Sequence, residues 1–278
     1  MVDTISLPLI IRWLQPYDFP HKLGLMDRFF KRQLARHGIC WAYTSTGIPW
    51  KLDLQNSTHR WIVYGKYEGA AFLNWARDFL TIDGVIVDSG ASIGQMLLYT
   101  SQWVPKGMVL AYEPGSRQAD WLAECLAANS ALPVELIRKG LGAASATLHL
   151  HDGGLTFTHG GQSVITETKG VPVEIVRLED ELAKRSIKRV DLWKLDVEGY
   201  EIPALTGAQE YLKNHQIRAI YVELHGTNGE QICRFLGGYG YDGFLINEDG
   251  RLTRIKALPE HTNGLFFPRV LPPDKEPK

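Results

Sequence analysis

Two acidic residues and two glycines have the types and the order of a binding site for a nucleotide-like cofactor. The stretch VIVDSGASIG is an apolar run that ends at Asp88 and continues through Gly90 and Gly94. It predicts a buried strand, a tight turn and then a helix. Glu113 ends the next apolar run, where a carboxylate can accept hydrogen bonds from both hydroxyls of a ribose. A dinucleotide, a phosphate, S-adenosylmethionine and no ligand at all are the candidates for what this turn holds.

The spacing within the turn separates these candidates. A nicotinamide site requires G-x-G-x-x-G after the first strand, and here Ser89 takes the place of the first glycine. A phosphate loop requires G-x-x-x-x-G-K-[ST], which is excluded because no lysine follows Gly94. The pattern D-x-G-x-x-x-G fits S-adenosylmethionine better, because its sulfonium tolerates an acid that would repel a pyrophosphate. Gly90 is expected to let the backbone pass close under the ligand, where a side chain would occupy the ligand's path, and Gly94 to let the helix start tightly against the strand.

The elements that must position these residues follow from the pattern of the chain. From about residue 85 to about residue 225, strand-like and helix-like stretches alternate, which predicts a parallel sheet with helices on both faces. VPVEIVR and RVDLWKLDVEG are among the expected strands, and SIGQMLLYTSQWV is an expected helix. Near the end, GYDGFLINEDGRLTRI and NGLFFP are expected to pair as antiparallel strands.

A helix is predicted near the N-terminus as well. KLGLMDRFFKRQLARHG places Leu23, Met26, Phe30 and Leu34 at helical spacing with basic residues between them. The favoured interpretation is a helix docked on the main domain through this apolar stripe. The alternative is a basic amphipathic helix that meets a membrane surface or an anionic substrate.

Bulk composition excludes several classes of protein. The chain has 278 residues, 45% of them apolar, which is enough for a sizeable core. Its net charge of −1 gives no electrostatic footprint for nucleic acid. Three cysteines lie far apart and predict single buried thiols in a reducing compartment. No apolar run approaches the roughly 20 residues of a membrane span, and the start lacks the pattern of a signal peptide. We therefore expect a cytoplasmic protein without a transmembrane segment.

One longer stretch resembles a known family. VDLWKLDVEGYEIPALTGAQEYL is similar to the signature of the FkbM family of S-adenosylmethionine-dependent methyltransferases, K-[IL]-D-V-E-G-x-E followed by L-x-G-A. VDSGASIG, YEP, VRLED and NGLFFP occur in the order that this family shows, so the resemblance runs from about residue 45 to residue 268. There are two departures. Ser92 stands where the family commonly has asparagine, and Tyr200, which could reshape the acceptor pocket, stands where a small residue is usual.

The resemblance implies a fold and an activity. The fold would be the α/β class I methyltransferase (Rossmann-like) fold, a seven-stranded, mostly parallel sheet with one antiparallel strand at the end. An N-terminal helical and hairpin extension (1–45) would precede the methyltransferase domain (46–268), and a flexible tail (269–278) would follow. The reaction would be methyl transfer to a hydroxyl of a sugar, glycolipid or natural product. The alternatives are a nicotinamide oxidoreductase and a non-catalytic cofactor-binding subunit on the same fold.

The chemistry is expected where the strands end. Ligands of open α/β sheets lie beyond the carboxyl ends of the strands, at the switch point, so the tips at Asp88 and Asp196 should face one cleft. Alternation along a strand predicts that Asp196 and Glu198 share a face with Lys194. The predicted cofactor-binding residues are Asp88, Ser89, Gly90, Ala91, Ser92, Gly94, Glu113, Pro114, Leu141 and Asp196.

Two catalytic arrangements are open. His225, Asp196 and Glu198 are the catalytic candidates, and either His225 or Asp196 could act as the general base that removes the hydroxyl proton. Alternatively, Asp196, Glu223 and His225 could hold Mg²⁺ or another divalent cation that lowers the pKa of the acceptor. The identity of the base and the need for a metal are not decided by the sequence.

Structural roles are the simpler interpretation for several neighbours of the site. Lys194 is expected to neutralise nearby acids, and Glu201 to favour the first turn of the next helix. Glu198 and Gly199 could serve only to shape the turn. The stretch 151–161, HDGGLTFTHGG, is expected to be an acceptor-side loop rather than a metal centre, because its histidines match no common ligand spacing. Tyr64 and Tyr67 could border the cofactor, and aromatic packing explains them equally well.

Overall fold

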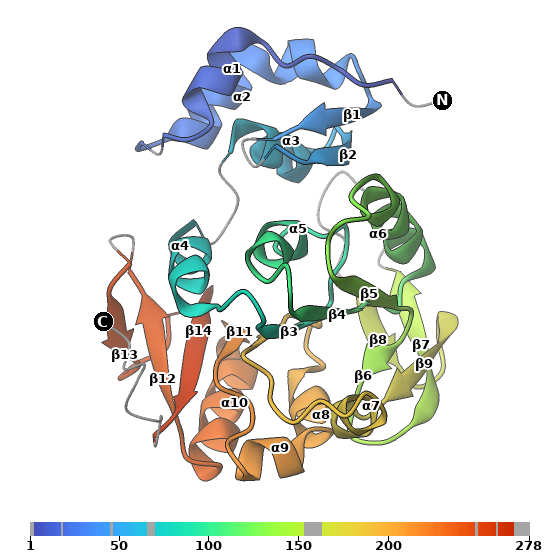
Figure 1. Ribbon diagram of the computed structural model, residues 1–278, viewed down its shortest axis with the longest axis vertical. Coiled ribbons are helices and arrows are strands. Elements are labelled where there is room, and N and C mark those ends of the chain that lie inside the picture. The colour runs from blue at the N-terminus through green and yellow to red at the C-terminus, as the bar shows by residue number, and fades with distance from the viewer. Residues whose placement is uncertain are drawn as a thin grey trace.

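The centre of the molecule is a mixed sheet with helices on both faces. A computed structural model describes residues 3–17, 19–44, 47–65, 70–152, 163–247, 250–259 and 261–269. Within these residues the main sheet has eight strands in the order β13-β12-β14-β11-β10-β3-β4-β5 (Figure 1). Its strands are β3 (Val85–Ser89), β4 (Met108–Tyr112), β5 (Val134–Ile137), β10 (Leu192–Leu195), β11 (Ile220–His225), β12 (Tyr241–Ile246), β13 (Leu252–Arg254) and β14 (His261–Pro268).

The directions of the strands confirm most of the expected topology. β5, β4, β3, β10 and β11 are parallel, and the chain order reverses between β3 and β10. β14 is antiparallel to both β11 and β12, as the C-terminal pattern predicted. The expected number of seven strands is one too low, because the chain turns back after β12 and pairs β13 with it.

The inner strands of the parallel part, β3, β4 and β10, are buried on both faces. Ile86 packs in one core with Phe72 and Leu97, whereas the next residue, Val87, packs in another core with Leu182. This explains the nearly continuous apolar strands, which are typical of parallel sheets. Figure 1 shows α4, α5 and α6 on one face and α7, α8, α9 and α10 on the other. Their bounds are α4 (Ala70–Phe79), α5 (Leu97–Thr100) followed by a 3₁₀ turn (Ser101–Trp103), α6 (Ser116–Ala128), α7 (Leu178–Lys184), α8 (Glu201–Thr206), α9 (Gln209–Lys213) and α10 (Gly226–Gly238).

A smaller sheet is inserted between β5 and α7. Its strand order is β6-β9-β7-β8, with a core of Leu150, Val173 and Ile175. The predicted strand VPVEIVR supplies β9, and ATLHLH lies in β7. The bounds are β6 (Gly140–Leu141), β7 (Ala146–Asp152), β8 (Ser163–Thr166) and β9 (Val171–Val176). Most of the stretch expected to be an acceptor-side loop (153–161) lies outside the described residues.

The N-terminal part packs on the α5 and α6 side of the main sheet (Figure 1). It consists of α1 (Leu9–Leu14), α2 (Lys22–Ala35), a hairpin of β1 (Ile39–Tyr43) and β2 (Pro49–Asp53), and α3 (Ser57–Tyr64). Met26 and Leu34 of the predicted apolar stripe are buried, in a core that continues to Leu98 of α5 and Trp121 of α6. The helix is therefore docked through its stripe, as the favoured interpretation predicted. The expected boundary at residue 45 falls in the connection between β1 and β2, at residues that the structure does not describe.

The cysteines agree with the expectation of single thiols. Cys40 and Cys125 are buried, Cys233 is partly buried, and all three are unpaired with one another. A search of the described helices finds none that combines the length and the apolar character needed to cross a bilayer.

Candidate active site

The turn after β3 is held by hydrogen bonds within the protein. The backbone N–H groups of Gly90 and Ala91 both donate to the carbonyl oxygen of Tyr112 on the neighbouring strand, at 3.0 and 3.1 Å. The N–H of Ser92 donates to Oε2 of Glu113 at 2.8 Å. A pyrophosphate-binding turn instead points its N–H groups at the ligand. These donors are already used, so the turn is poorly suited to a phosphate.

Ser92 and Gly94 have left-handed backbone angles that explain their residue types. Ser92 has φ of 49°, a conformation in which asparagine is several-fold enriched among non-glycine residues. The asparagine that is common in the FkbM family fits this angle, and serine here accepts some strain. Gly94 has φ of 89°, and a Cβ there would lie 2.8 Å from Leu122 and 3.1 Å from Leu98. Gly94 therefore allows the turn to pack closely against α6 and α5.

Gly90 is required by the packing of two strand tips, and its expected place under a ligand stays a prediction. Gly90 has φ of 74°, and a Cβ there would lie 1.8 Å from the carbonyl oxygen of Asp196. A side chain would strike the backbone directly after β10. Gly90 is needed because the tips of β3 and β10 approach each other closely, and the N–H of Asp196 donates to the carbonyl oxygen of Ser89 at 3.2 Å.

Glu113 is the buried carboxylate that closes the turn. Its side chain is buried at the end of β4, where Oε1 accepts the N–H of Gly115 at 2.8 Å and Oε2 accepts that of Ser92. Burial raises the pKa of Glu113, and these two backbone hydrogen bonds oppose the rise. A carboxylate can accept about four hydrogen bonds, so both oxygens keep capacity for ribose hydroxyls.

Other predicted cofactor residues contribute backbone and packing in this structure. The Ser89 hydroxyl accepts the indole N–H of Trp193 at 2.8 Å, inside the core. Ala91 and Leu141 are buried in the two main cores. Pro114 is partly buried beside Gly140. Direct contacts of these four residues with a cofactor stay predictions.

Lys194 links the two acids at the strand tips. Its ammonium donates to the carbonyl oxygen of Gly90 at 2.8 Å and lies 3.3 Å from Oδ1 of Asp88 and 3.4 Å from Oδ2 of Asp196. Asp88 is almost fully buried, so burial raises its pKa and the lysine opposes that rise. The interpretation of Lys194 as a neutralising partner is confirmed.

The expected alternation of side chains does not extend past Leu195. β10 ends there, and residues 196–199 form a tight turn in which Glu198 has φ of 53° and Gly199 has φ of 93°. Asp196 and Glu198 therefore share no strand face with Lys194, because neither is on a strand.

Glu201 holds this turn in place, a role that the sequence analysis missed. Its Oε1 accepts the N–H groups of Val197 at 3.2 Å and Gly199 at 3.1 Å, and its Oε2 accepts the amide of Asn228 at 2.6 Å. The sequence contains a signal for this role, because Glu201 is an acid three positions after Glu198. A carboxylate at that position can cap the N–H groups of the preceding turn.

Glu198 has the electrostatic properties of a general base. Its half-buried side chain is desolvated, and the charges of Asp196, Glu223 and Glu201 add to this effect. Together they raise the pKa of Glu198 to about 7, although Lys194 opposes the rise. A base of that pKa is half deprotonated near neutral pH, where it removes protons efficiently.

The remaining candidates differ in their surroundings. His225 is exposed at the end of β11, directly before α10. Among the residues that the structure describes, no three histidine, cysteine or carboxylate side chains form a group that could hold a metal. The metal site proposed from Asp196, Glu223 and His225 is therefore not formed. Tyr64 is fully buried and donates its hydroxyl to Asp27 at 2.9 Å, so packing explains it, and Tyr67 lies outside the described residues.

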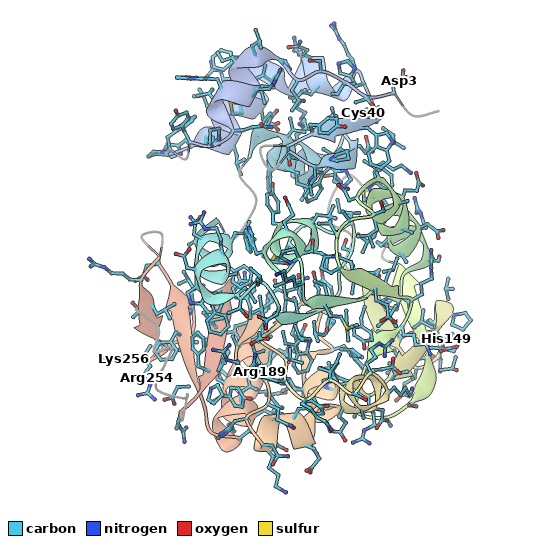
Figure 2. The ribbon with its side chains drawn as sticks, in the orientation of Figure 1. Asp3, Cys40, His149, Arg189, Arg254 and Lys256 are labelled. Atoms are coloured by element: carbon cyan, nitrogen blue, oxygen red, sulfur yellow. The ribbon has the colours of Figure 1, made fainter. Side chains whose placement is uncertain are left out.

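The small sheet lies next to the KLDVEG turn. The ring of Tyr200 lies over Gly142, where a Cβ would come within 3.2 Å of it and within 2.5 Å of Ile175. Burial and the charge of Glu167, beyond β8, raise the pKa of Tyr200. His149 of β7 lies at the edge of the molecule in the view of Figure 2, with its ring nitrogen Nδ1 3.0 Å from the carbonyl oxygen of Glu167.

The fold and the site together define a class of enzyme. The strand order, the turn at the switch point and the carboxylate after the second strand are those of a class I S-adenosylmethionine-dependent methyltransferase. Comparison with known proteins gives the family. The family model described as the methyltransferase FkbM domain matches residues 88–243, and the chain belongs to this family of S-adenosylmethionine-dependent methyltransferases. The nicotinamide alternative is thereby set aside.

Two relatives that are similar to this chain are named methyltransferases. Methyltransferase sdnD of Sordaria araneosa is 32% identical over 196 residues, which cover 56% of this chain and 73% of the relative. Methyltransferase 1 of Beauveria bassiana is 30% identical over 148 residues, 46% of this chain and 59% of the relative. A solved methyltransferase structure from Streptococcus mutans, in complex with SAH, has a TM-score of 0.44 at 9% identity and covers 73% of this chain and 98% of that one.

Proposed function

We propose that this methyltransferase transfers the methyl group to a hydroxyl oxygen of a sugar, glycolipid or natural product, with Glu198 as the general base. One observation carries the proposal. Next to the cofactor turn, a half-buried carboxylate has its pKa raised to about 7 by burial and by neighbouring acids. An amine with a free lone pair needs no such base, whereas an alcohol must lose its proton as it attacks.

The residues of the site support this assignment of roles. S-adenosylmethionine supplies a methyl group on a positively charged sulfur, which keeps the bonding electron pair when the methyl leaves. As the acceptor oxygen bonds to the methyl carbon, its proton passes to the carboxylate of Glu198. Glu201 fixes the backbone on both sides of Glu198, and such fixed positioning supplies much of the rate of a transfer reaction.

Neighbouring residues are proposed to form the acceptor side of the site. Asp196 has a side chain that is 44% exposed, and His225 is exposed at the end of the adjacent strand β11. We propose that Asp196 and His225 both contact the acceptor. Tyr200 would form the wall of the acceptor pocket next to the small sheet. The acidic character of this group, with a chain of net charge −1, is unfavourable for a nucleic-acid acceptor.

The test is the position of the transferred methyl group. The purified chain is incubated with methyl-labelled S-adenosylmethionine and panels of sugars, glycolipids and polyhydroxylated natural products, and each labelled product is examined by NMR. We expect label on oxygen. Label on nitrogen or carbon only, or label only with RNA, would contradict the proposal while leaving the methyltransferase class intact.

A further inference from the structure

The outward faces of α1 and α2 carry an unusual concentration of large apolar side chains. Each helix buries one side, through Ile11 of α1 and through Met26 and Leu34 of α2. On the other side Leu9 is 79% exposed and Phe29 is 67% exposed. Between positions 9 and 29, the large apolar side chains that are exposed are Leu9, Ile10, Trp13, Tyr17, Leu25 and Phe29. We call this set, with the cations described next, the outer face.

In each of the two segments, some of these side chains are direct neighbours. Leu25 and Phe29 are four positions apart on α2 and so are neighbours on its surface. The rings of Trp13 and Tyr17 lie 5.7 Å apart. The end of α1 is joined to the start of α2 by Lys22, whose ammonium donates to the carbonyl oxygen of Tyr17 at 2.6 Å. Figure 1 shows both helices on the side of the N-terminal part that lies away from the eight-stranded sheet.

Among the described residues of α1 and α2, the exposed charged side chains are all positive. Arg28 and Arg32 are exposed and alternate with Leu25 and Phe29 along one side of α2. The further exposed cations are Arg12, Lys31 and Arg36. The single acid within the two helices is Asp27. It is turned inward, where it accepts hydrogen bonds from the Arg60 guanidinium at 2.8 and 2.9 Å and so balances a buried cation.

We propose that the outer face binds the surface of an anionic lipid bilayer. Exposed leucine and phenylalanine can enter the boundary between headgroups and acyl chains, and tryptophan and tyrosine prefer that depth. Arginines beside them attract anionic headgroups. The described helices are not of the kind that spans a bilayer, so the protein lies on the surface. A second copy fits the face less well, because a two-fold contact would bring the same cations of both copies together.

The proposal is tested by vesicle co-sedimentation of the full chain. One set of vesicles is phosphatidylcholine alone, and in the other about one third is phosphatidylglycerol. We expect binding to the second set only, weakened by salt. Each arginine removed should weaken binding by about fivefold, so R28Q/R32Q should weaken it by more than tenfold. W13A/F29A should weaken it by a similar factor, through loss of apolar contact.

Matched controls remove the same chemistry from other surfaces. K106Q/K213Q removes two exposed cations and I82A/V171A removes two exposed apolar side chains, and both should bind vesicles as the unaltered chain does. Unchanged thermal unfolding verifies that each variant is folded. Equal retention by both vesicle sets, or equal losses in the control variants, would overturn the proposal. So would the absence of vesicle binding together with a dimer in light scattering that W13A/F29A abolishes, because a second copy would then cover the face.

Discussion

Replacing Gly90 by alanine is expected to force the tips of β3 and β10 apart. Alanine at φ of 74° carries a left-handed strain of about 1–2 kcal/mol. Its Cβ would also lie 1.8 Å from the carbonyl oxygen of Asp196, so the two backbones must separate by more than 1 Å. Overpacking of this kind costs about 1–3 kcal/mol more. We therefore expect G90A to lower the free energy of unfolding by about 2–5 kcal/mol.

Gly250 provides the matched control. Its φ is 80°, and a Cβ there would meet nothing within 4 Å, so G250A carries only the strain of about 1–2 kcal/mol. Urea unfolding of both variants measures the difference in their free energies of unfolding. Titration with S-adenosylhomocysteine should show weaker binding for G90A alone, because the displaced tip of β3 leads into the turn that is predicted to bind the cofactor. If G90A lost no more stability than G250A, the close approach of Gly90 and Asp196 would be refuted.

The remaining predictions concern three charged residues of the site. E113Q should weaken S-adenosylhomocysteine binding by about 10- to 100-fold in calorimetry, because an amide cannot accept both backbone N–H groups; affinity equal to that of the control E230Q would contradict this. K194M should lower the free energy of unfolding in urea by about 3–5 kcal/mol, because it leaves Asp88 buried without its partner. The loss should be smaller in acid, where Asp88 is protonated, and K213M is the control. The raised pKa of Glu198 makes its contribution to stability fall as pH rises from about 4.5 to about 7. E198Q should therefore unfold at a higher temperature than the unaltered chain above pH 7 and not near pH 4.5; a difference independent of pH would count against the assigned pKa.

Sequence reasoning was most successful where local and long-range preferences agree. The apolar run before Asp88 is typical of a strand buried on both faces, and β3 is the middle one of the five parallel strands. Glu113 was placed correctly at the end of β4 because a parallel neighbour must end at the same edge. The antiparallel strands at the C-terminus followed from their turn residues. In these regions the local sequence pattern and the tertiary contacts favour the same secondary structure.

The errors arose where tertiary contacts decide the local structure. The helix expected to begin at Ser92 forms only from Leu97, since Ser92 and Gly94 have left-handed angles set by contacts with Glu113 and Leu122. α10 was not predicted because it begins with GTNG, whose residues are poor helix formers, and it is stabilised by packing of Ile232 and Leu236. β10 ends at Leu195, and Glu201 accepts two N–H groups of the turn that follows it.

The central claim is that Glu198 takes the proton of the acceptor, and the pH dependence of methyl transfer tests it most directly. With an acceptor in hand, the rate constant kcat/KM should rise tenfold per pH unit below about 7 and then level off. E198Q should be slower by about 10²–10⁴-fold and should lose this dependence, with S-adenosylhomocysteine affinity unchanged and with E230Q behaving as the unaltered chain. An E198Q enzyme that keeps both its rate and the same pH profile would contradict the account.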